Sequence, residues 1–284
     1  GLLGYRSVCE TAPVGIDPII TAPDLEGMLG NVVVCDVRWY LDGRSGRDAY
    51  DGGHIPGAVY VDLDEHLAAP PTWEDGRHPL PSAEAFAAAL GSLGIGPDDT
   101  VVACDDSGGM SAGRLVWMLR VLGQPAALLD GGLPAWPGPL ETGSTAPSPT
   151  VCPVRPWPDG AFVEADDVAG AILVLDARSP ERYSGDSEPM DARAGHLPGA
   201  LNSPFALNLT EGLFRSADEL ADHYRSLGVA DASDVVVYCG SGVSACHDLL
   251  AMEYAGLGRG RLYVGSWSQW SATDRPVATG PDPR

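Results

Sequence analysis

The chain repeats itself, and this internal repeat limits its possible folds more than any other feature. Residues 32–38 (VVVCDVR) match residues 172–178 (ILVLDAR), and residues 53–58 (GHIPGA) match residues 195–200 (GHLPGA). The matching segments lie roughly 134 to 142 residues apart. Because the same pattern occurs twice in the same order, we expect two domains of one fold in tandem.

Short apolar runs alternate with helical patterns in each half. Residues 82–93 and 216–227 predict helices that begin at a serine N-cap, and Ser216 with Glu219 forms a capping box. Residues 113–122 and 245–255 predict further helices. This alternation predicts α/β domains, each with a mostly parallel sheet flanked by helices. We place the domains at 14–140 and 160–277, joined by a linker at 141–159 that is rich in Pro, Ser and Thr.

One cysteine stands at the end of a predicted strand. Cys239 follows the apolar run 235–238 and precedes the small-residue loop 240–244 (GSGVS), which leads into a predicted helix. Ligands of parallel α/β sheets bind beyond the carboxyl ends of strands. The backbone N–H groups of such a loop and the positive end of a helix favour an anion, so we expect Cys239 to react as a thiolate. In the first half, the repeat aligns Asp105 with Cys239.

Composition excludes several kinds of chemistry. All 17 basic residues are arginine, which rules out lysine Schiff bases, Walker-type phosphate lysines and Ser-x-x-Lys sites. The net charge of −22 disfavours binding to nucleic acid and to anionic membranes. No Cys/His spacing is typical of zinc, so we expect neither a metal nor a cofactor. With no charged-then-apolar leader and no membrane-length apolar run, we expect a soluble, cytoplasmic protein with free thiols.

The motifs taken together resemble the rhodanese superfamily of sulfurtransferases. They are the doubled Gly-His-[Ile/Leu]-Pro-Gly-Ala motif, the Cys239 loop, and the segment 265–270 (GSWSQW) with its partner at 131–136. The resemblance covers nearly the whole chain and implies tandem rhodanese-like domains, of which the first is inactive because Asp105 replaces the cysteine. The loop sequence CGSGVS further resembles that of the 3-mercaptopyruvate sulfurtransferases.

The resemblance implies a mechanism. Cys239 would take sulfur from the small-molecule donor 3-mercaptopyruvate as a persulfide and pass it to a thiol, a thioredoxin-like protein or cyanide. Arg182 would bind the donor carboxylate, and a second family arginine would follow the Glu-Pro pair, where this chain has Met190 and we expect Arg193 to substitute. A proton relay would consist of Asp48, His54 and Ser244. The donor and the persulfide would be held by the amides of Gly240, Ser241, Gly242 and Val243.

Three alternatives remain. Thiosulfate-type relatives carry Arg and Lys directly after the cysteine, whereas Gly240 and Ser241 are neutral, which favours mercaptopyruvate over thiosulfate. A sulfur carrier that never cycles is the second alternative. A phosphatase of related fold needs a Cys-x5-Arg loop, and here Ala245 stands where the arginine is required. The histidine of the Gly-His motif occurs in both halves, so His54 and His196 are also consistent with a purely structural role.

Overall fold

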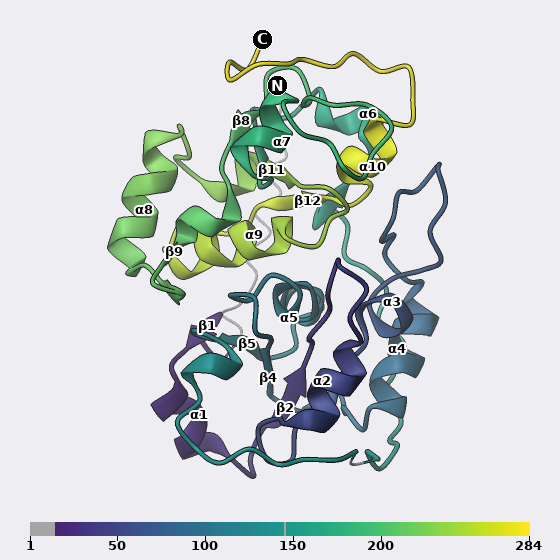
Figure 1. The fold of residues 1–284 in the computed structure, drawn as a ribbon, viewed down its shortest axis with the longest axis vertical. Coiled ribbons are helices and arrows are strands. Elements are labelled where there is room, and N and C mark those ends of the chain that lie inside the picture. The colour runs from purple at the N-terminus through teal and green to yellow at the C-terminus, as the bar shows by residue number, and fades with distance from the viewer. Residues whose placement is uncertain (1–14, 145) are drawn as a thin grey trace, which may run out of the picture.

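The molecule consists of two lobes of the same architecture, stacked along its long axis (Figure 1). A computed structural model describes residues 15–144 and 146–284; Cys9 and residue 14, the first residue of the predicted N-terminal domain, lie outside them. Each lobe contains a five-stranded sheet in which every strand pair is parallel. The predicted tandem of α/β domains is therefore confirmed.

The two sheets have equivalent strand orders. The first is β1-β5-β4-β2-β3 and the second is β6-β12-β11-β7-β8. Asp36 pairs with Cys104 in the first sheet as Asp176 pairs with Tyr238 in the second, which places Asp105 and Cys239 at equivalent positions. The strands are β1 (Ile19–Ile20), β2 (Val33–Asp36), β3 (Val59–Tyr60), β4 (Val101–Cys104), β5 (Ala126–Leu129), β6 (Phe162–Val163), β7 (Leu173–Asp176), β8 (Leu201–Asn202), β11 (Val235–Tyr238) and β12 (Arg261–Tyr263), with a separate hairpin of β9 (Leu209–Thr210) and β10 (Leu213–Phe214).

The four predicted helices are present within one or two residues of their expected bounds. They are α4 (Ala83–Ser92), α5 (Ala112–Val121), α8 (Ala217–Ser226) and α9 (Ala245–Tyr254). The Ser216–Glu219 capping box is formed, and the Ser82 side chain caps α4. The remaining helices are α1 (Ala22–Met28), α2 (Gly46–Gly52), α3 (Leu63–His66), α6 (Ala165–Val168), α7 (Pro180–Ser184) and α10 (Ser266–Trp270), with 3₁₀ turns η1 (Leu133–Ala135), η2 (Phe205–Asn208) and η3 (Ala232–Asp234).

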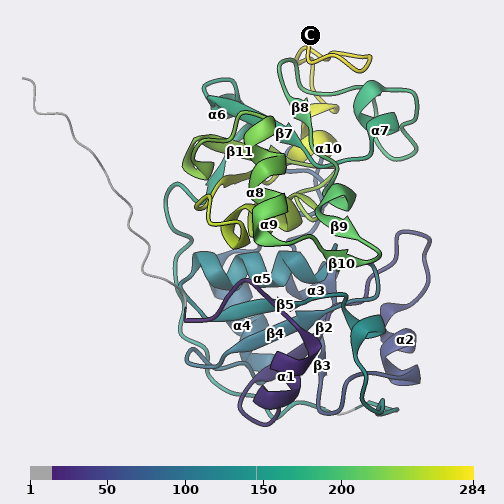
Figure 2. The same ribbon diagram turned by 90° about the vertical axis from the view of Figure 1, so that its left-hand side faces the viewer.

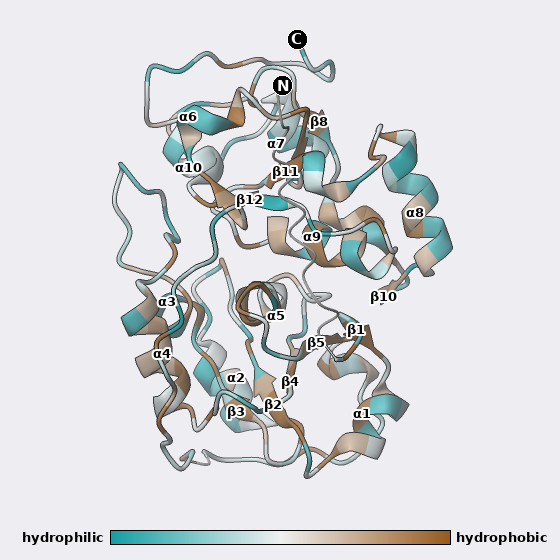
Figure 3. Ribbon diagram, turned by 180° about the vertical axis from the view of Figure 1, so that it is seen from behind, coloured by the Kyte–Doolittle hydropathy of each residue, from teal (hydrophilic) through white to brown (hydrophobic). Residues whose placement is uncertain are grey.

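Helices α5 and α9 form the centre of the interface between the lobes (Figure 2). Residues 112–120 of α5 are all buried, and α5 lies between the lobes with a largely apolar surface (Figure 3). One cluster of buried apolar side chains runs through both lobes without a break. Because the lobes share this core, their relative orientation is fixed.

The Pro-rich segment 141–159 is held against the first lobe. The Thr150 N–H donates to the Gly91 carbonyl at 2.9 Å, and the Trp157 ring N–H donates to the Pro81 carbonyl at 2.8 Å. Trp157 also stacks on Phe86. The described residues of this segment form no helix and no extended strand, in agreement with the sequence. The connection therefore follows the surface of the first lobe.

The repeated histidines, His54 and His196, make the same packing contacts in both halves. The His54 ring stacks on Tyr50 with centroids 3.8 Å apart, and its Nδ1 lies 2.8 Å from the Tyr50 carbonyl. His196 makes the same two contacts with Tyr183, at the same distances. Both rings are fully buried. The Gly-His motif is thus a packing unit of the fold, and its presence in both halves follows from that.

Within the described ranges, no helix is long and apolar enough to cross a membrane. The same residues contain no group of His, Cys, Asp and Glu side chains arranged to hold a metal ion. Their five cysteines are all free.

Candidate active site

A cleft of about 110 Å³ opens between the two lobes at the carboxyl end of β11. Both lobes contribute to it, so neither domain alone would form it. The first lobe contributes Trp39, Leu41, Arg77, His78 and Met110, and the second contributes Arg182, Met190, Cys239, Gly240, Ser241, Val243 and Ser244.

Cys239 lies at the base of this cleft, 2% exposed. Its sulfur accepts a hydrogen bond from the Gly242 N–H at 3.1 Å, and its own N–H donates to the Ser266 hydroxyl at 3.2 Å. The Trp267 N–H donates to the Cys239 carbonyl at 3.0 Å, so the repeated 265–270 motif supports the loop from below. Gly242 has a φ of +75°, and a Cβ there would lie 2.6 Å from the Val264 carbonyl oxygen. Only glycine fits this turn, which directs its N–H at the sulfur.

The equivalent loop of the first lobe surrounds the side-chain carboxylate of one of its own residues, Asp105. The Asp105 carboxylate is fully buried and occupies the position that corresponds to the Cys239 side chain. Backbone amides that converge on one point in this way form an anion-binding nest. The fold thus builds this loop to surround a negative charge, and in the second lobe that charge would be on sulfur. The N–H donors to Asp105 are those of Ser107, Gly109, Ser111 and Ala112, at 2.8–3.0 Å.

His78, which the sequence reasoning missed, reaches the loop from the first lobe. Its Nδ1 lies 2.7 Å from the Ser241 hydroxyl oxygen, and its Nε2 lies 3.1 Å from a carboxylate oxygen of Asp64. The carboxylate can only accept, so Nε2 carries the proton and Nδ1 accepts from the Ser241 O–H. Burial is the main cause that lowers the pKa of His78 to about 4, so the ring is neutral at physiological pH. Trp39 donates its ring N–H to Asp64 at 2.9 Å and packs edge-on against His78.

The predicted relay of Asp48, His54 and Ser244 is not assembled in the structure. Asp48 is exposed on α2, and His54 is enclosed by its contacts with Tyr50; neither lines the cleft. Ser244 does line it, at the first residue before α9, but its side chain makes no capping hydrogen bond. The serine, histidine and carboxylate that the structure does bring together are Ser241, His78 and Asp64.

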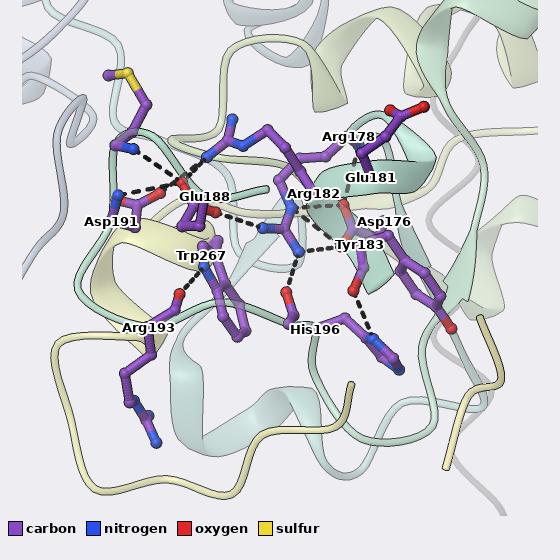
Figure 4. A network of polar contacts seen from close by, with 12 residues as sticks. Asp176, Arg178, Glu181, Arg182, Tyr183, Glu188, Asp191, Arg193, His196 and Trp267 are labelled. Atoms are coloured by element: carbon purple, nitrogen blue, oxygen red, sulfur yellow. Dashed lines mark hydrogen bonds and ion pairs between the residues drawn. The ribbon is translucent and has the colours of Figure 1, made fainter. Parts of the chain in front are cut away.

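The predicted arginines have separate environments. Arg182, on α7, lines the cleft and pairs with Glu188 at 2.7 Å and with Asp191 at 3.1 Å (Figure 4). The Arg193 guanidinium points away from those carboxylates (Figure 4) and donates to the carbonyls of residues 270, 271 and 275. Arg193 thus holds the C-terminal segment. It does not take the place of the arginine that the family has at the position of Met190. The first lobe, however, brings Arg77 into the cleft.

A further cation lies behind the loop. Arg114, on α5, is fully buried and donates to the Gly242 carbonyl at 2.7 Å and to the His78 carbonyl at 2.9 Å. Among the described residues no carboxylate lies within ion-pair distance of it, and its Nε has no partner. An arginine side chain stays protonated even when it is buried. The first lobe therefore places a fixed positive charge beneath the cysteine loop and ties the loop to the backbone of His78.

Comparisons with known proteins agree with this geometry. A family model described as the rhodanese-like domain matches residues 21–138 and again residues 163–273. A putative thiosulfate sulfurtransferase of Mycobacterium tuberculosis is 40% identical over 278 residues, which cover 92% of this chain and 97% of that protein. A probable 3-mercaptopyruvate sulfurtransferase of Pseudomonas aeruginosa is 39% identical over 279 residues, covering 92% and 98%.

Solved structures show the same relationship. The 3-mercaptopyruvate sulfurtransferase from Leishmania major matches with a TM-score of 0.83 and 29% identity, covering 93% of this chain and 76% of that one. The resemblance inferred from the motifs is thereby confirmed. The double match to one domain model and the relatives of nearly equal length show that this chain belongs to the rhodanese family, as a tandem of two rhodanese-like domains.

Proposed function

We propose that this chain is a sulfurtransferase that takes sulfur from 3-mercaptopyruvate onto Cys239 and passes it on to a thiol acceptor. The observation that carries the proposal is the contact of a neutral histidine with a serine hydroxyl, two residues past the cysteine in the same cleft. Relatives named as 3-mercaptopyruvate sulfurtransferases support it.

The reaction requires one proton to move. The Cys239 thiolate attacks the donor sulfur, an S–S bond forms, the C–S bond breaks, and the bonding electrons stay on the methylene carbon of the leaving group. That carbon must gain a proton to become the methyl group of pyruvate, and the donor thiol must lose one. Ser241, hydrogen-bonded to the acceptor nitrogen of His78, is placed to take the thiol proton and return it to the carbon. The product is a Cys239 persulfide, and no net proton is consumed.

The new terminal sulfur is an anion and needs donors. The Gly242 N–H already contacts the Cys239 sulfur, and the Asp105 loop shows how many amides this turn directs inward. Arg114 adds a buried positive charge behind the loop. Such fixed donors stabilise an anion without rearranging when it forms.

A thiosulfate sulfurtransferase is the second candidate, because the relative in Mycobacterium tuberculosis carries that name. Thiosulfate contains no thiol proton, and its leaving group, sulfite, needs none to depart. With thiosulfate as the donor, the sulfur-loading step would therefore need no proton transfer by a serine–histidine pair. The pair therefore favours the thiol donor.

The two donors can be separated with variants of the relay. We expect His78→Gln and Ser241→Ala to lower the rate of Cys239 loading from mercaptopyruvate by about 10²- to 10⁴-fold. Loading from thiosulfate should change little. Intact mass would record the gain of one sulfur, its loss on adding reductant, and repeated cycling with a small thiol. A matched control is His223→Gln, since His223 stands on α8 outside the cleft.

Three outcomes would contradict the proposal. A wild-type protein that loads sulfur only from thiosulfate would make the second candidate correct. If Ser244→Ala, and not Ser241→Ala, abolished loading from mercaptopyruvate, the relay would be assigned to the wrong serine. A protein that loads once and never cycles with any thiol would be a carrier.

A further inference from the structure

Two arginines from different lobes converge on the backbone just after Cys239. A Cβ built on Gly240 would lie 2.9 Å from Nη2 of Arg77 and 3.2 Å from Nη1 of Arg182. Both guanidinium groups therefore face one point in the cleft, beside the reactive sulfur. Two forks aimed at one point suit a carboxylate, which accepts paired N–H bonds.

Two buried carboxylates hold these arginines from the other side. Asp191 bridges Nη1 of Arg77 and Nη2 of Arg182, and Glu188 accepts from Nη2 of Arg182 at 2.7 Å. Asp191 and Glu188 are 5% and 4% exposed. Figure 4 shows how Arg182 reaches both of them. The network fixes Nη1 of Arg77 and Nη2 of Arg182, and so leaves the N–H groups on the Gly240 side available.

A further N–H group of this arginine pair is buried without a partner. Nε of Arg182 is enclosed, and no acceptor among the described residues reaches it. An unpaired buried donor is costly, and a ligand oxygen that paired with it would remove that cost. The free groups therefore mark a place for an acceptor-rich ligand.

Arg77 is placed by contacts between the lobes. Its N–H donates to the Ser268 hydroxyl at 3.1 Å. Gly76, with φ +91°, lies so close to the second lobe that a Cβ would be 2.7 Å from the Gly265 carbonyl oxygen. The turn before Arg77 is thus built to press against the second lobe and to deliver the guanidinium to the cleft.

We propose that Arg77 and Arg182 together bind the donor carboxylate, so that Arg77 does from the first lobe what an arginine at position 190 would do from the second. This inference rests on the proposed function, since it names the group that recognises the donor. Met190 lines the cleft, and its side chain has no N–H donor. The pair selects a donor with a carboxylate close to its sulfur, and the bound donor bridges the two lobes.

The first test separates binding from chemistry. We expect Arg77→Met to raise KM for mercaptopyruvate by about 10- to 100-fold, with kcat changed only a few-fold, because a charge-assisted pair to the donor is lost. Adding Met190→Arg to Arg77→Met should restore most of the lost affinity. The matched control is Arg225→Met, which removes an exposed cation on α8 that pairs weakly with Asp222. An unchanged KM in Arg77→Met, or no rescue by Met190→Arg, would overturn the inference.

The second test needs no turnover. Pyruvate bound in the cleft should slow the alkylation of Cys239 by iodoacetamide, whereas pyruvamide, its uncharged amide, should not. Arg77→Met should weaken the protection by pyruvate about 10-fold or more. If this variant fails to fold because Asp191 loses a partner, the double variant Arg77→Met, Asp191→Asn removes both charges and is measured instead.

The two tests distinguish failure of the inference from failure of the function. A wild-type protein that mercaptopyruvate cannot load refutes the proposed function, yet loss of pyruvate protection in Arg77→Met would still support the carboxylate site. A wild-type protein that loads normally, with protection by pyruvate unchanged in Arg77→Met, refutes the inference and leaves the function standing.

Discussion

Asp248 gives the sharpest quantitative prediction, because it is a fully buried acid on the helix that follows the cysteine loop. Burial raises its pKa from 3.8 to about 8. One carboxyl oxygen accepts from the Asn208 amide at 2.7 Å, and Tyr224 and His247 pack around the same amide. At neutral pH the folded protein therefore holds this carboxyl in its neutral form.

The sign and size of the effect follow from linkage. The unfolded chain releases the Asp248 proton above about pH 4, whereas the folded protein keeps it up to about pH 8. This group contributes stability that is fully present at low pH and is lost as the pH rises through the folded pKa. At about 1.4 kcal/mol per pH unit, the full loss is about 6 kcal/mol, of which about 4 kcal/mol is expressed at neutral pH.

Asp248→Asn tests this directly, since the amide has the shape of the neutral acid but nothing to ionise. We expect the free energy of unfolding of the variant to exceed that of the wild type, with a gap that widens by about 4 kcal/mol between about pH 5 and about pH 8. His247, whose pKa burial lowers to about 4, titrates in both proteins and cancels in the difference. Urea unfolding at each pH measures the gap.

The test needs a control variant and a result that would contradict the reasoning. Asp222→Asn is the matched control, because it makes the same change in an exposed carboxyl on α8. If Asp248→Asn gave a gap that did not vary with pH, or a loss of stability at every pH, the folded protein would hold Asp248 as an anion and the reasoning from burial would be wrong.

Three further predictions concern the cleft. Cys239→Ser should abolish sulfur loading, whereas Cys246→Ser should not, because burial raises the pKa of the Cys246 thiol to about 12 and keeps it protonated; intact mass separates them. Arg114→Met removes the cation bonded to the Gly242 carbonyl and should slow alkylation of Cys239 about 10-fold at neutral pH, with unchanged rates arguing against an electrostatic role. The rate of loading from mercaptopyruvate should fall with acid near the His78 pKa of about 4, and a fall centred near 6.5, the ordinary pKa of a histidine, would show that burial does not lower the pKa of this ring.

The predicted residues that the structure brings together in the cleft are those that one half contains by itself. Cys239, its loop and Arg182 belong to the second half, where strand, turn and helix follow in order, and local patterns suffice to find them. The domain fold was predictable for the same reason. Its strands are continuous apolar runs and its helices begin at recognisable caps.

The sequence analysis did not find His78, Asp64 and Arg77, because the first lobe presents them at the interface between the lobes, which no local pattern describes. The repeat also misled the choice of histidine. His54 drew attention because its motif is doubled, but His54 and His196 make the same contacts in both halves, and a residue that both halves contain serves what they share, namely the fold. His78 has no counterpart in the second half: its turn leads to the cap of α4, and the equivalent turn before α8 carries Phe214. The polar residue without a match in the other half, His78, is the one that lines the cleft.

These two turns differ in the side chains that each lobe presents to the other. The turn before α4 of the first lobe reaches the Cys239 loop, and the turn before α8 of the second lobe reaches the neighbourhood of the Asp105 loop. From the first lobe, the turn docks on Ser268 and brings His78 to Ser241; from the second, the Phe214 N–H donates to Asp130 at 2.7 Å, near the Asp105 loop.

The turn from the first lobe contributes polar side chains to the second lobe, whereas the turn from the second lobe contributes mainly apolar ones to the first. The Asp105 loop is already saturated by its own carboxylate, so the turn that reaches its neighbourhood has only to pack, and Leu213 lies beside Gly131 there. The Cys239 loop carries no built-in acid, so its amides remain available for an anion that the reaction creates, and the turn that reaches it supplies a base and a cation. Replacing the carboxylate by a thiol would therefore not be sufficient to give the first lobe activity. An Asp105→Cys variant would acquire the nucleophile, but the second lobe places Leu209 beside Gly108 and Leu213 beside Gly131 there. We expect the variant to gain no second persulfide in intact mass after incubation with mercaptopyruvate.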